Sequence, residues 1–485
     1  HLHEDLEGGL PMESLPPLDQ NKLQTAVHEA LSDWTRSAQS GTDLSPQLLL
    51  VREKLAESGG EQTIYAARQA TYEVLEEALE RLAGQDEVGA KVLRARFYDG
   101  EITRQVAARL HASPDQVNRW QRLAIETLTA ILLTAEMKRR EERTRFVLED
   151  LPAAPYSRLF GFQALQSEIA GQLLRPDEPL VIALSGIGGI GKTSLADAVI
   201  RLVAPALAFE RIIWLRVTTD PFADDGVPER SWAQVAGALK KALRLEGDGD
   251  ESQDAQQSRI AEALRARSFL VCLDNLEQED QTIYFLEKVR LLAGPSKFLL
   301  TTRARPTVSA PAYFRSLEEL EFADAIELLR DQAHSSGADA LAAATDQDLN
   351  GIYDVTGGNP LALRLVAGLT AVMSLRDILS GLEKSRPGPI EDMYKRIYWA
   401  AWQMLTADSQ SLLQAMPLVA ESGGLPLQLQ AISGLSEDRF WPAVHELFAR
   451  SLLEVRGTVH ERRYSIHRLT ETFLRTEIVD WPEAE

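Results

Sequence analysis

The sequence is poor in the features that mark secreted and membrane-bound proteins. It has one cysteine among 485 residues, Cys272, so a disulfide scaffold is excluded and a reducing compartment fits. It has no uninterrupted apolar run of about 18 residues, which predicts that no helix spans a membrane. The first residues lack the basic-then-apolar order of a signal peptide. We therefore expect a cytoplasmic protein with no membrane partner.

Positive charge is also scarce. The chain has 51 Lys and Arg against 72 Asp and Glu, a formal net charge of −21. This balance argues against a protein that coats nucleic acid along its whole surface, but it leaves room for a local basic module. The apolar content of 45% is sufficient for packed cores, and the length predicts three or four domains.

The most informative motif is the glycine-rich stretch 186–193, Gly-Ile-Gly-Gly-Ile-Gly-Lys-Thr, a complete phosphate-binding loop. An apolar run at 180–184 predicts a buried strand before it, and 194–200 predicts a helix after it. Backbone N–H groups of such a loop, together with the helix N-terminus, bind phosphates. We expect Lys192 to reach the β- and γ-phosphates and the Thr193 hydroxyl to bind Mg²⁺. The predicted nucleotide ligands in this loop are Gly186, Gly188, Gly189, Ile190, Gly191, Lys192, Thr193 and Ser194.

Further apolar runs predict the rest of a parallel, doubly wound sheet with its ligand at the carboxyl ends of the strands. The strands are expected at 211–217, 269–273 and 297–303. The second of these ends in Asp274, the pattern of a Walker B carboxylate that holds Mg²⁺. Cys272, inside that strand, is expected to be a core residue without chemistry.

These pieces together resemble the NB-ARC class of STAND signalling ATPases, which occurs in plant resistance proteins, apoptotic adaptors and bacterial regulators. The resemblance covers residues 156 to 475 and rests on five motifs in the family's order. They are the loop 186–193, Leu273-Asp274-Asn275, Thr301-Thr302-Arg303, Gly357-Gly358-Asn359-Pro360-Leu361-Ala362-Leu363 and Tyr464-Ser465-Ile466-His467-Arg468. The resemblance implies that Arg303 meets the γ-phosphate, that Pro360 packs on adenine, and that His467 contacts the β-phosphate of ADP in a closed state.

Three positions depart from the family pattern. Phe162 stands where an arginine near the adenine is common, and Arg468 replaces an aspartate next to His467. Asn275 replaces a second acid after Asp274, so the base for hydrolysis stays open. Glu277 is a candidate for that base, and a surface helix residue is the equally plain alternative.

The N-terminal part reads as all-α, with amphipathic helices at 21–34, 48–55 and 66–82. Helices at 103–110 and from Pro114 onward, joined by a tight turn and started by Ser113 as N-cap, predict a helix-turn-helix. This stretch resembles the helix-turn-helix of bacterial sigma factors that reads the −35 promoter element, except that His111 stands where glycine is usual. Between Lys91 and Arg122 there are seven basic and three acidic residues, a local balance of +4.

The recognition helix is predicted over 114–123, with Gln121 also pointing outward and 138–143 extending the helix as a solvated charged face. The residues expected to face DNA are Gln116, Asn118, Arg119 and Arg122. The alternative is a packing module that kept the fold but binds no DNA.

The predicted fold class is multidomain α/β plus all-α. We expect an N-terminal helical region at 1–146 with the helix-turn-helix at about 88–135, a P-loop domain at 147–315, a small helical domain at 316–383 and a winged helix at 384–485. Residues 1–18 and 247–257 are expected to be loose.

The predicted function is an ATP/ADP switch that is closed with ADP and opens and self-associates with ATP, with slow hydrolysis and a DNA-binding output. The alternative is an immune or scaffold protein whose N-terminal helices bind protein partners. A third possibility, a metabolic ATPase or kinase, lacks any constellation of residues for a second substrate. The signal that acts on the switch, a ligand or a sensor partner, is not identified by the sequence.

Overall fold

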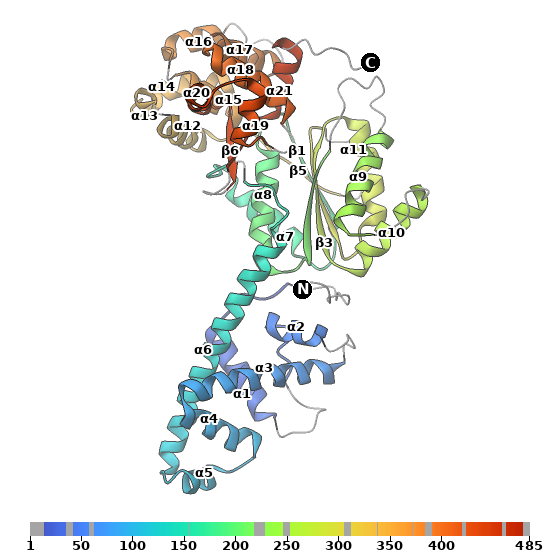
Figure 1. Ribbon diagram of the computed structural model, residues 1–485, viewed down its shortest axis with the longest axis vertical. Helices are drawn as coiled ribbons and strands as arrows, with labels where there is room; N and C mark the ends of the chain where they lie inside the picture. The colour runs from blue at the N-terminus through green and yellow to red at the C-terminus, as the bar shows by residue number, and fades with distance from the viewer. Residues whose placement is uncertain are drawn as a thin grey trace.

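The structure is a computed structural model that describes residues 14–34, 42–57, 63–154, 156–217, 228–245, 253–304, 312–336, 338–370, 372–383, 390–419, 423–457 and 462–478. It is elongated, with a helical N-terminal region at one end and a larger α/β and helical part at the other (Figure 1). One long helix, α6 (Pro114–Val147), runs from the first part to the second. The predicted fold class, α/β joined to all-α, is confirmed.

The N-terminal region is all-α, as predicted, and has two cores. Its elements before α6 are α1 (Gln20–Ser32), α2 (Leu49–Glu57), α3 (Ile64–Gln85), α4 (Glu87–Leu93), a π-helical turn at Arg94–Tyr98 and α5 (Thr103–Arg109). The larger core packs α1, α2, α3 and α4 against the middle of α6. The smaller one belongs to the helix-turn-helix and joins Val92 and Ala95 to Val106, Ala107 and Val117.

Helix α6 is 34 residues long, which corresponds to roughly 50 Å at 1.5 Å per residue. Ser113 caps its first turn by accepting the Gln116 N–H at 3.2 Å. Its last residue, Val147, is buried in the core of the nucleotide-binding part, and Arg143 donates to the carbonyl of Glu210 at 3.3 Å. The prediction of a solvated face at 138–143 is wrong for Arg140, because its side chain is largely buried beside the fully buried Glu136.

A five-stranded, all-parallel sheet with the order β2-β3-β4-β1-β5 forms the centre of the α/β part. Its strands are β1 (Val181–Ser185), β2 (Arg211–Arg216), β3 (Phe269–Leu276), β4 (Lys297–Thr302) and β5 (Tyr313–Ser316). The alternation of side chains along β1 gives each face its own core. Ile182 and Leu184 pack with α7 (Gln163–Leu173) and α8 (Lys192–Val203), whereas Val181 and Ala183 belong to the core on the opposite face of the sheet. The edge strand β5 was not predicted.

Helices α9 (Pro228–Ala242), α10 (Gln253–Ala266) and α11 (Glu279–Leu292) cover the second face. The expected loose segment 247–257 is wrong from Gln253 onward, where α10 begins. Residues 247–252 of this segment lie outside the described part of the chain. The expected loose N-terminus is wrong at Leu15, which is buried against the nucleotide-binding part and donates its N–H to the carbonyl of Ala206 at 2.8 Å.

The stretches predicted as a small helical domain and a winged helix, names that are kept below, complete the second part. The first has α12 (Phe322–Ser336), α13 (Asp339–Ala342), α14 (Asp346–Thr356), α15 (Pro360–Leu369) and α16 (Leu375–Glu383). The second has α17 (Ile390–Gln403), α18 (Ala407–Ala415), α19 (Pro426–Ser433), α20 (Glu437–Ala449), the hairpin β6 (Glu454–Gly457) and β7 (Arg462–Ser465), and α21 (Arg468–Phe473). The sequence predicts this hairpin as a wing with strands at 452–455 and 463–466 joined through Gly457, and the hairpin is confirmed. The sequence also predicts a helix at 317–320, which is wrong, because that stretch is irregular and leads from β5 to α12.

One continuous core runs through these two domains and one face of the sheet. In the described part of the chain, no helix is both long and apolar enough to cross a membrane.

Candidate nucleotide-binding site

The loop between β1 and α8 has the backbone of a phosphate cradle. Gly186, Gly189 and Gly191 have φ angles of +153°, +74° and +102°, which residues with a Cβ rarely adopt. Helix α8 starts directly after this loop, at Lys192, so its first N–H groups open toward the cradle. Ile190 is fully buried and pins the loop to the core, so any contact it makes with a phosphate would come from its backbone.

Lys192 lies over the loop that it follows. Its ammonium donates to the carbonyls of Gly186 and Ile187 at 2.7 and 2.9 Å. These bonds keep a positive charge above the cradle, where the predicted role in phosphate binding needs it.

The predicted magnesium ligands meet at the carboxyl ends of the strands. The Thr193 hydroxyl donates to Asp274 Oδ1 at 2.8 Å, and the Thr301 hydroxyl donates to the same oxygen at 2.6 Å. Asp274 is only 5% exposed, so these two hydroxyls hold a carboxylate that water hardly reaches. The described residues contain no group of three or more Asp, Glu, His or Cys side chains that could by itself hold a metal ion. The oxygen donors fit Mg²⁺.

The side chain of Asn275 stabilises an irregular point in strand β3. Its φ is +84°, and its side-chain amide donates to the carbonyl of Val217 at 3.0 Å. Asparagine tolerates this left-handed backbone better than most residues, and the pairing of β3 with β4 shifts register at this point. The side chain therefore fixes a bulge in the strand rather than supplying an acid or a base.

The two predicted residues for γ-phosphate chemistry are bound to each other. Arg303 Nε lies 3.1 Å from Glu277 Oε1, and the side chains are 35% and 21% exposed. The guanidinium also borders the loop, because a methyl group on Gly188 would lie 3.5 Å from its Nη2. The geometry places sensor and base candidates side by side, and their roles stay predictions.

The small helical domain contacts the loop through the residues on either side of Pro360. Asn359 donates from its side-chain amide to the carbonyl of Gly188 at 3.2 Å, and the Leu361 N–H donates to the carbonyl of Gly189 at 3.3 Å. Pro360 is the first residue of α15. The motif thus reaches the loop, and the role of Pro360 toward adenine stays a prediction.

The winged helix reaches the loop as well. His467 caps α21, its Nδ1 accepting the N–H of Leu469 at 3.1 Å. Leu469 then borders the loop, because a methyl group on Gly188 would lie 3.5 Å from its Cδ1. His467 is therefore held two residues from a loop contact, and its role toward a phosphate stays a prediction.

Three residues at the loop were not predicted to act there. Phe162, noted only as a departure from the family pattern, packs its ring against Gly191, where an added methyl would meet it at 3.2 Å. Asn359 was quoted only as part of a motif. Tyr394, on α17, donates its hydroxyl to Asn359 Oδ1 at 2.6 Å and lies 3.3 Å from the Gly188 carbonyl. No sequence pattern pointed to Tyr394.

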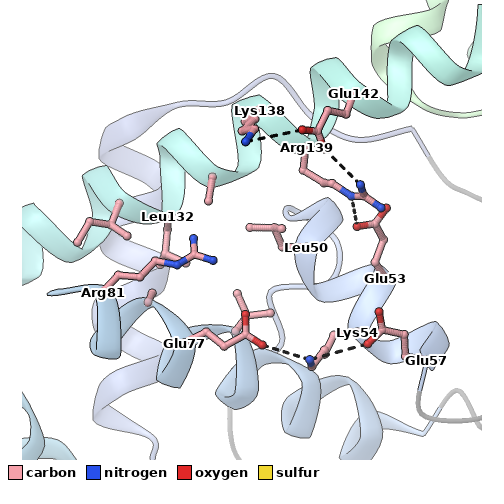
Figure 2. A pocket seen from close by; sticks show the side chains of 14 residues that line it. Leu50, Glu53, Lys54, Glu57, Glu77, Arg81, Leu132, Lys138, Arg139 and Glu142 are labelled. Carbon is pink, nitrogen blue, oxygen red and sulfur yellow. Dashed lines mark hydrogen bonds and ion pairs between the residues drawn. The ribbon is translucent and has the colours of Figure 1, made fainter. Parts of the chain in front are cut away.

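A pocket of about 330 Å³ lies far from this loop, between α2, α3 and α6 (Figure 2). Its floor is apolar, and ion pairs on its rim join the helices, among them Arg139 with Glu53 at 2.7 Å and Lys54 with Glu77 at 3.1 Å. Because the charged side chains on the rim pair with one another between helices, we regard them as contacts that hold the helices together, and we assign the pocket no ligand.

The helix-turn-helix has the predicted geometry at its turn. His111 adopts the left-handed backbone, with φ of +52°, that glycine usually supplies there. The side chains of Gln116, Asn118, Arg119 and Arg122 are all exposed at the start of α6. Gln121 does not point outward as predicted, because its side chain accepts a hydrogen bond from Arg96 Nε at 3.1 Å.

Comparisons with known proteins match this module. The family model described as "NB-ARC domain" matches residues 162–338. "Probable disease resistance protein RF9" of Arabidopsis thaliana is 28% identical over 170 residues, 34% of this chain and 15% of the relative. "Disease resistance protein RPV1" of Vitis rotundifolia is 24% identical over 231 residues, 46% of this chain and 16% of the relative. The chain thus spans about a sixth of the length of these relatives.

Among solved structures, a STAND protein with a tetratricopeptide repeat sensor from Pyrococcus horikoshii is 20% identical with a TM-score of 0.43, covering 67% of this chain and 43% of that chain. The ORC1 protein of Aeropyrum pernix, in complex with DNA, is 14% identical with a TM-score of 0.33, covering 68% and 96%. Domains that match the NB-ARC model bind ATP or ADP. The phosphate loop and Asp274 both lie within residues 162–338, the stretch that matches the NB-ARC model.

Proposed function

We propose that the chain is an ATP/ADP-controlled switch of the STAND type whose output is DNA binding by its helix-turn-helix. The observation that carries the proposal is the continuity of α6. Its first turns present the exposed Arg119 and Arg122, and its last residue is buried in the core of the nucleotide-binding part. A change of the nucleotide-binding part therefore reaches the candidate DNA surface through one unbroken element.

The second support is that both additional domains close on the phosphate loop. Asn359 and Leu361 of the small helical domain bond to Gly188 and Gly189, and Leu469 of the winged helix lies against the same loop. We take this arrangement as the closed form, which ADP favours, while ATP at Lys192 and Arg303 favours an open form that self-associates. Two nucleotides shift such an equilibrium only by binding the two forms with different affinity.

The third support is the charge on the DNA-facing surface. Arg119 and Arg122 are exposed on α6, and neither takes part in an ion pair among the described residues. Unpaired arginines at the start of a recognition helix suit contacts with phosphates and base edges.

The test is fluorescence anisotropy of labelled duplex DNA with ADP or with a non-hydrolysable ATP analogue, across a salt series. We expect binding that differs between the nucleotides and weakens steeply with salt. The double substitution of Arg119 and Arg122 by Ala should abolish it, whereas Arg145→Ala, an exposed arginine near the other end of α6, should leave it intact. No binding with either nucleotide would refute the DNA output and favour an N-terminal region that binds protein partners.

A further inference from the structure

The carbonyl edge of the phosphate loop, Gly186 to Gly189, is fully engaged. Lys192 binds the first two carbonyls, and the small helical domain together with α17 binds the last two. A nucleotide phosphate needs the N–H groups of such a loop and leaves its carbonyls to other partners. The N–H groups of the loop can therefore bind a phosphate while its carbonyls are bound by other parts of the molecule.

Asn359 is the centre of this contact, and its orientation is dictated by its neighbours. It is fully buried, and its Oδ1 accepts the N–H groups of Leu361 and Ala362 at 3.1 and 3.3 Å as the N-cap of α15. The amide nitrogen must then point the other way, toward the Gly188 carbonyl. A single side chain thus starts a helix of one domain and binds the loop of another.

Tyr394 fixes that orientation from the winged helix. Its hydroxyl has one proton to donate, and the short 2.6 Å distance assigns it to Asn359 Oδ1 rather than to the Gly188 carbonyl at 3.3 Å. The fit is close, because a methyl group on Gly189 would come within 2.5 Å of the hydroxyl. Tyr394 is 4% exposed, so water does not offer the Asn359 oxygen an easy substitute.

An aromatic stack continues from Tyr394 to the helix that His467 caps. The Tyr394 ring lies 6.4 Å from that of Tyr398, which lies 5.3 Å from that of Phe473 on α21. The Tyr398 hydroxyl is also bonded to the hydroxyl of Thr470 on α21, at 3.1 Å. A displacement of α21 would therefore move Tyr398 and, through the stacked rings, the Tyr394 hydroxyl that binds Asn359.

We propose that Tyr394 and Asn359 are positioning residues through which the winged helix contacts the Gly188 carbonyl and holds the phosphate loop in place. The inference rests on the proposed function, because it describes how the closed form retains its nucleotide. Opening of the winged helix withdraws the Tyr394 hydroxyl, Asn359 loses one of the three hydrogen bonds that its Oδ1 accepts, and its hold on the Gly188 carbonyl weakens. In this scheme the loop backbone couples the domains alongside any direct contact of His467 with a phosphate.

The test uses two near-isosteric variants of the full chain. Tyr394→Phe keeps the ring and the stack but removes the hydroxyl. Asn359→Asp keeps a good N-cap but replaces the donor toward Gly188 with an acceptor, so two oxygens face each other. Tyr313→Phe is the matched control, since its hydroxyl bonds to Glu168 within the same domain, away from the loop.

The first measurement is amide hydrogen exchange without nucleotide. We expect peptides that cover 186–193 and the start of α15 to exchange about fivefold faster or more in both variants, as one lost hydrogen bond predicts, and to be unchanged in Tyr313→Phe. The second is release of a fluorescent ADP after a chase with excess ADP, which should be about five- to tenfold faster in Tyr394→Phe and at least as fast in Asn359→Asp. The double variant should exceed Asn359→Asp by less than about twofold, because both residues act on one carbonyl.

The outcomes separate the two proposals. A wild-type chain that binds no nucleotide would refute the switch, yet the exchange experiment would still decide whether the contact holds the loop. Wild-type binding and release with both variants indistinguishable from Tyr313→Phe in exchange and in ADP release would overturn the inference and leave the switch standing.

Discussion

A buried carboxylate on α6 is expected to hold the N-terminal region together. Glu136 is fully buried, and its Oε1 accepts the Leu49 N–H and Arg140 Nε, both at 2.7 Å. Its Oε2 accepts the Leu50 N–H at 3.1 Å. Glu136 thereby satisfies the start of α2 from another helix, while Arg140 continues to the carbonyls of Pro16 and Gln47 at 2.8 and 2.7 Å.

Substitution of Glu136 by Gln keeps one acceptor and turns the other oxygen into a donor that faces Leu50. One orphaned N–H costs about 1–3 kcal/mol, and the remaining bonds lose their charge assistance, so we expect a loss of about 2 kcal/mol. Glu136→Leu also leaves the Arg140 charge buried without a counter-ion and should cost about 3–5 kcal/mol.

Unfolding of a chain with several domains is not two-state, so the assay is local hydrogen exchange at the first turn of α2. The control is Glu141→Gln on the same helix, where a 74% exposed side chain pairs with Arg145. That change should cost less than about 0.5 kcal/mol. The reasoning is refuted if Glu136→Leu protects the α2 amides as well as the control does.

Three further outcomes are expected. Burial lowers the pKa of Lys297 to about 8 from 10.5, although its ammonium donates to the carbonyls of Gln172, Arg175 and Asp177. The unfolded chain therefore binds more protons between these pH values, so the urea midpoint of wild type should rise relative to that of Lys297→Met as the pH increases from 8 to 10.5; a difference independent of pH would contradict it. Thr193→Ala should make ADP affinity insensitive to Mg²⁺ in calorimetry with and without EDTA, since it removes the hydroxyl beside Asp274; a retained magnesium effect would count against this site. Arg303→Ala should lower the ratio of ATP to ADP affinity by about tenfold and change ADP affinity less than twofold, since only the γ-phosphate needs a second cation beside Lys192; an equal loss for both nucleotides would show that Arg303 serves the loop alone.

The parts of the site that lie within one stretch of sequence were predictable. The loop 186–193, Asp274 and the turn around Pro360 each combine a local backbone demand with a chemical group, and such combinations leave a pattern in the sequence. The helix-turn-helix was readable for the same reason, since Ser113, Pro114 and the buried spacing of Val106, Ala107 and Val117 are local signals.

The parts that depend on contacts between domains were not predictable. Tyr394 sits on a helix where an inward tyrosine is the ordinary choice for a core, and only the tertiary arrangement brings its hydroxyl to Asn359. The same holds for Glu136, which reads as one of many charges on a long helix until α2 is seen to start against it. Strand β5 was missed because its four residues are too few for a periodic pattern and carry a charge at Arg315.

The length of α6 determines how the N-terminal region is connected to the nucleotide-binding part. The sequence predicted a recognition helix at 114–123 and a solvated, charged helical extension at 138–143. The structure carries the helix without interruption to Val147, and Arg140, Arg143 and Leu15 fasten its far end to neighbouring segments and to the nucleotide-binding part. Long helices without Pro or Gly in their interior bend only gently, so a rotation at one end arrives at the other as a displacement. In the proposed switch, the nucleotide state would therefore act on the N-terminal region by displacing one rigid helix rather than by folding a linker.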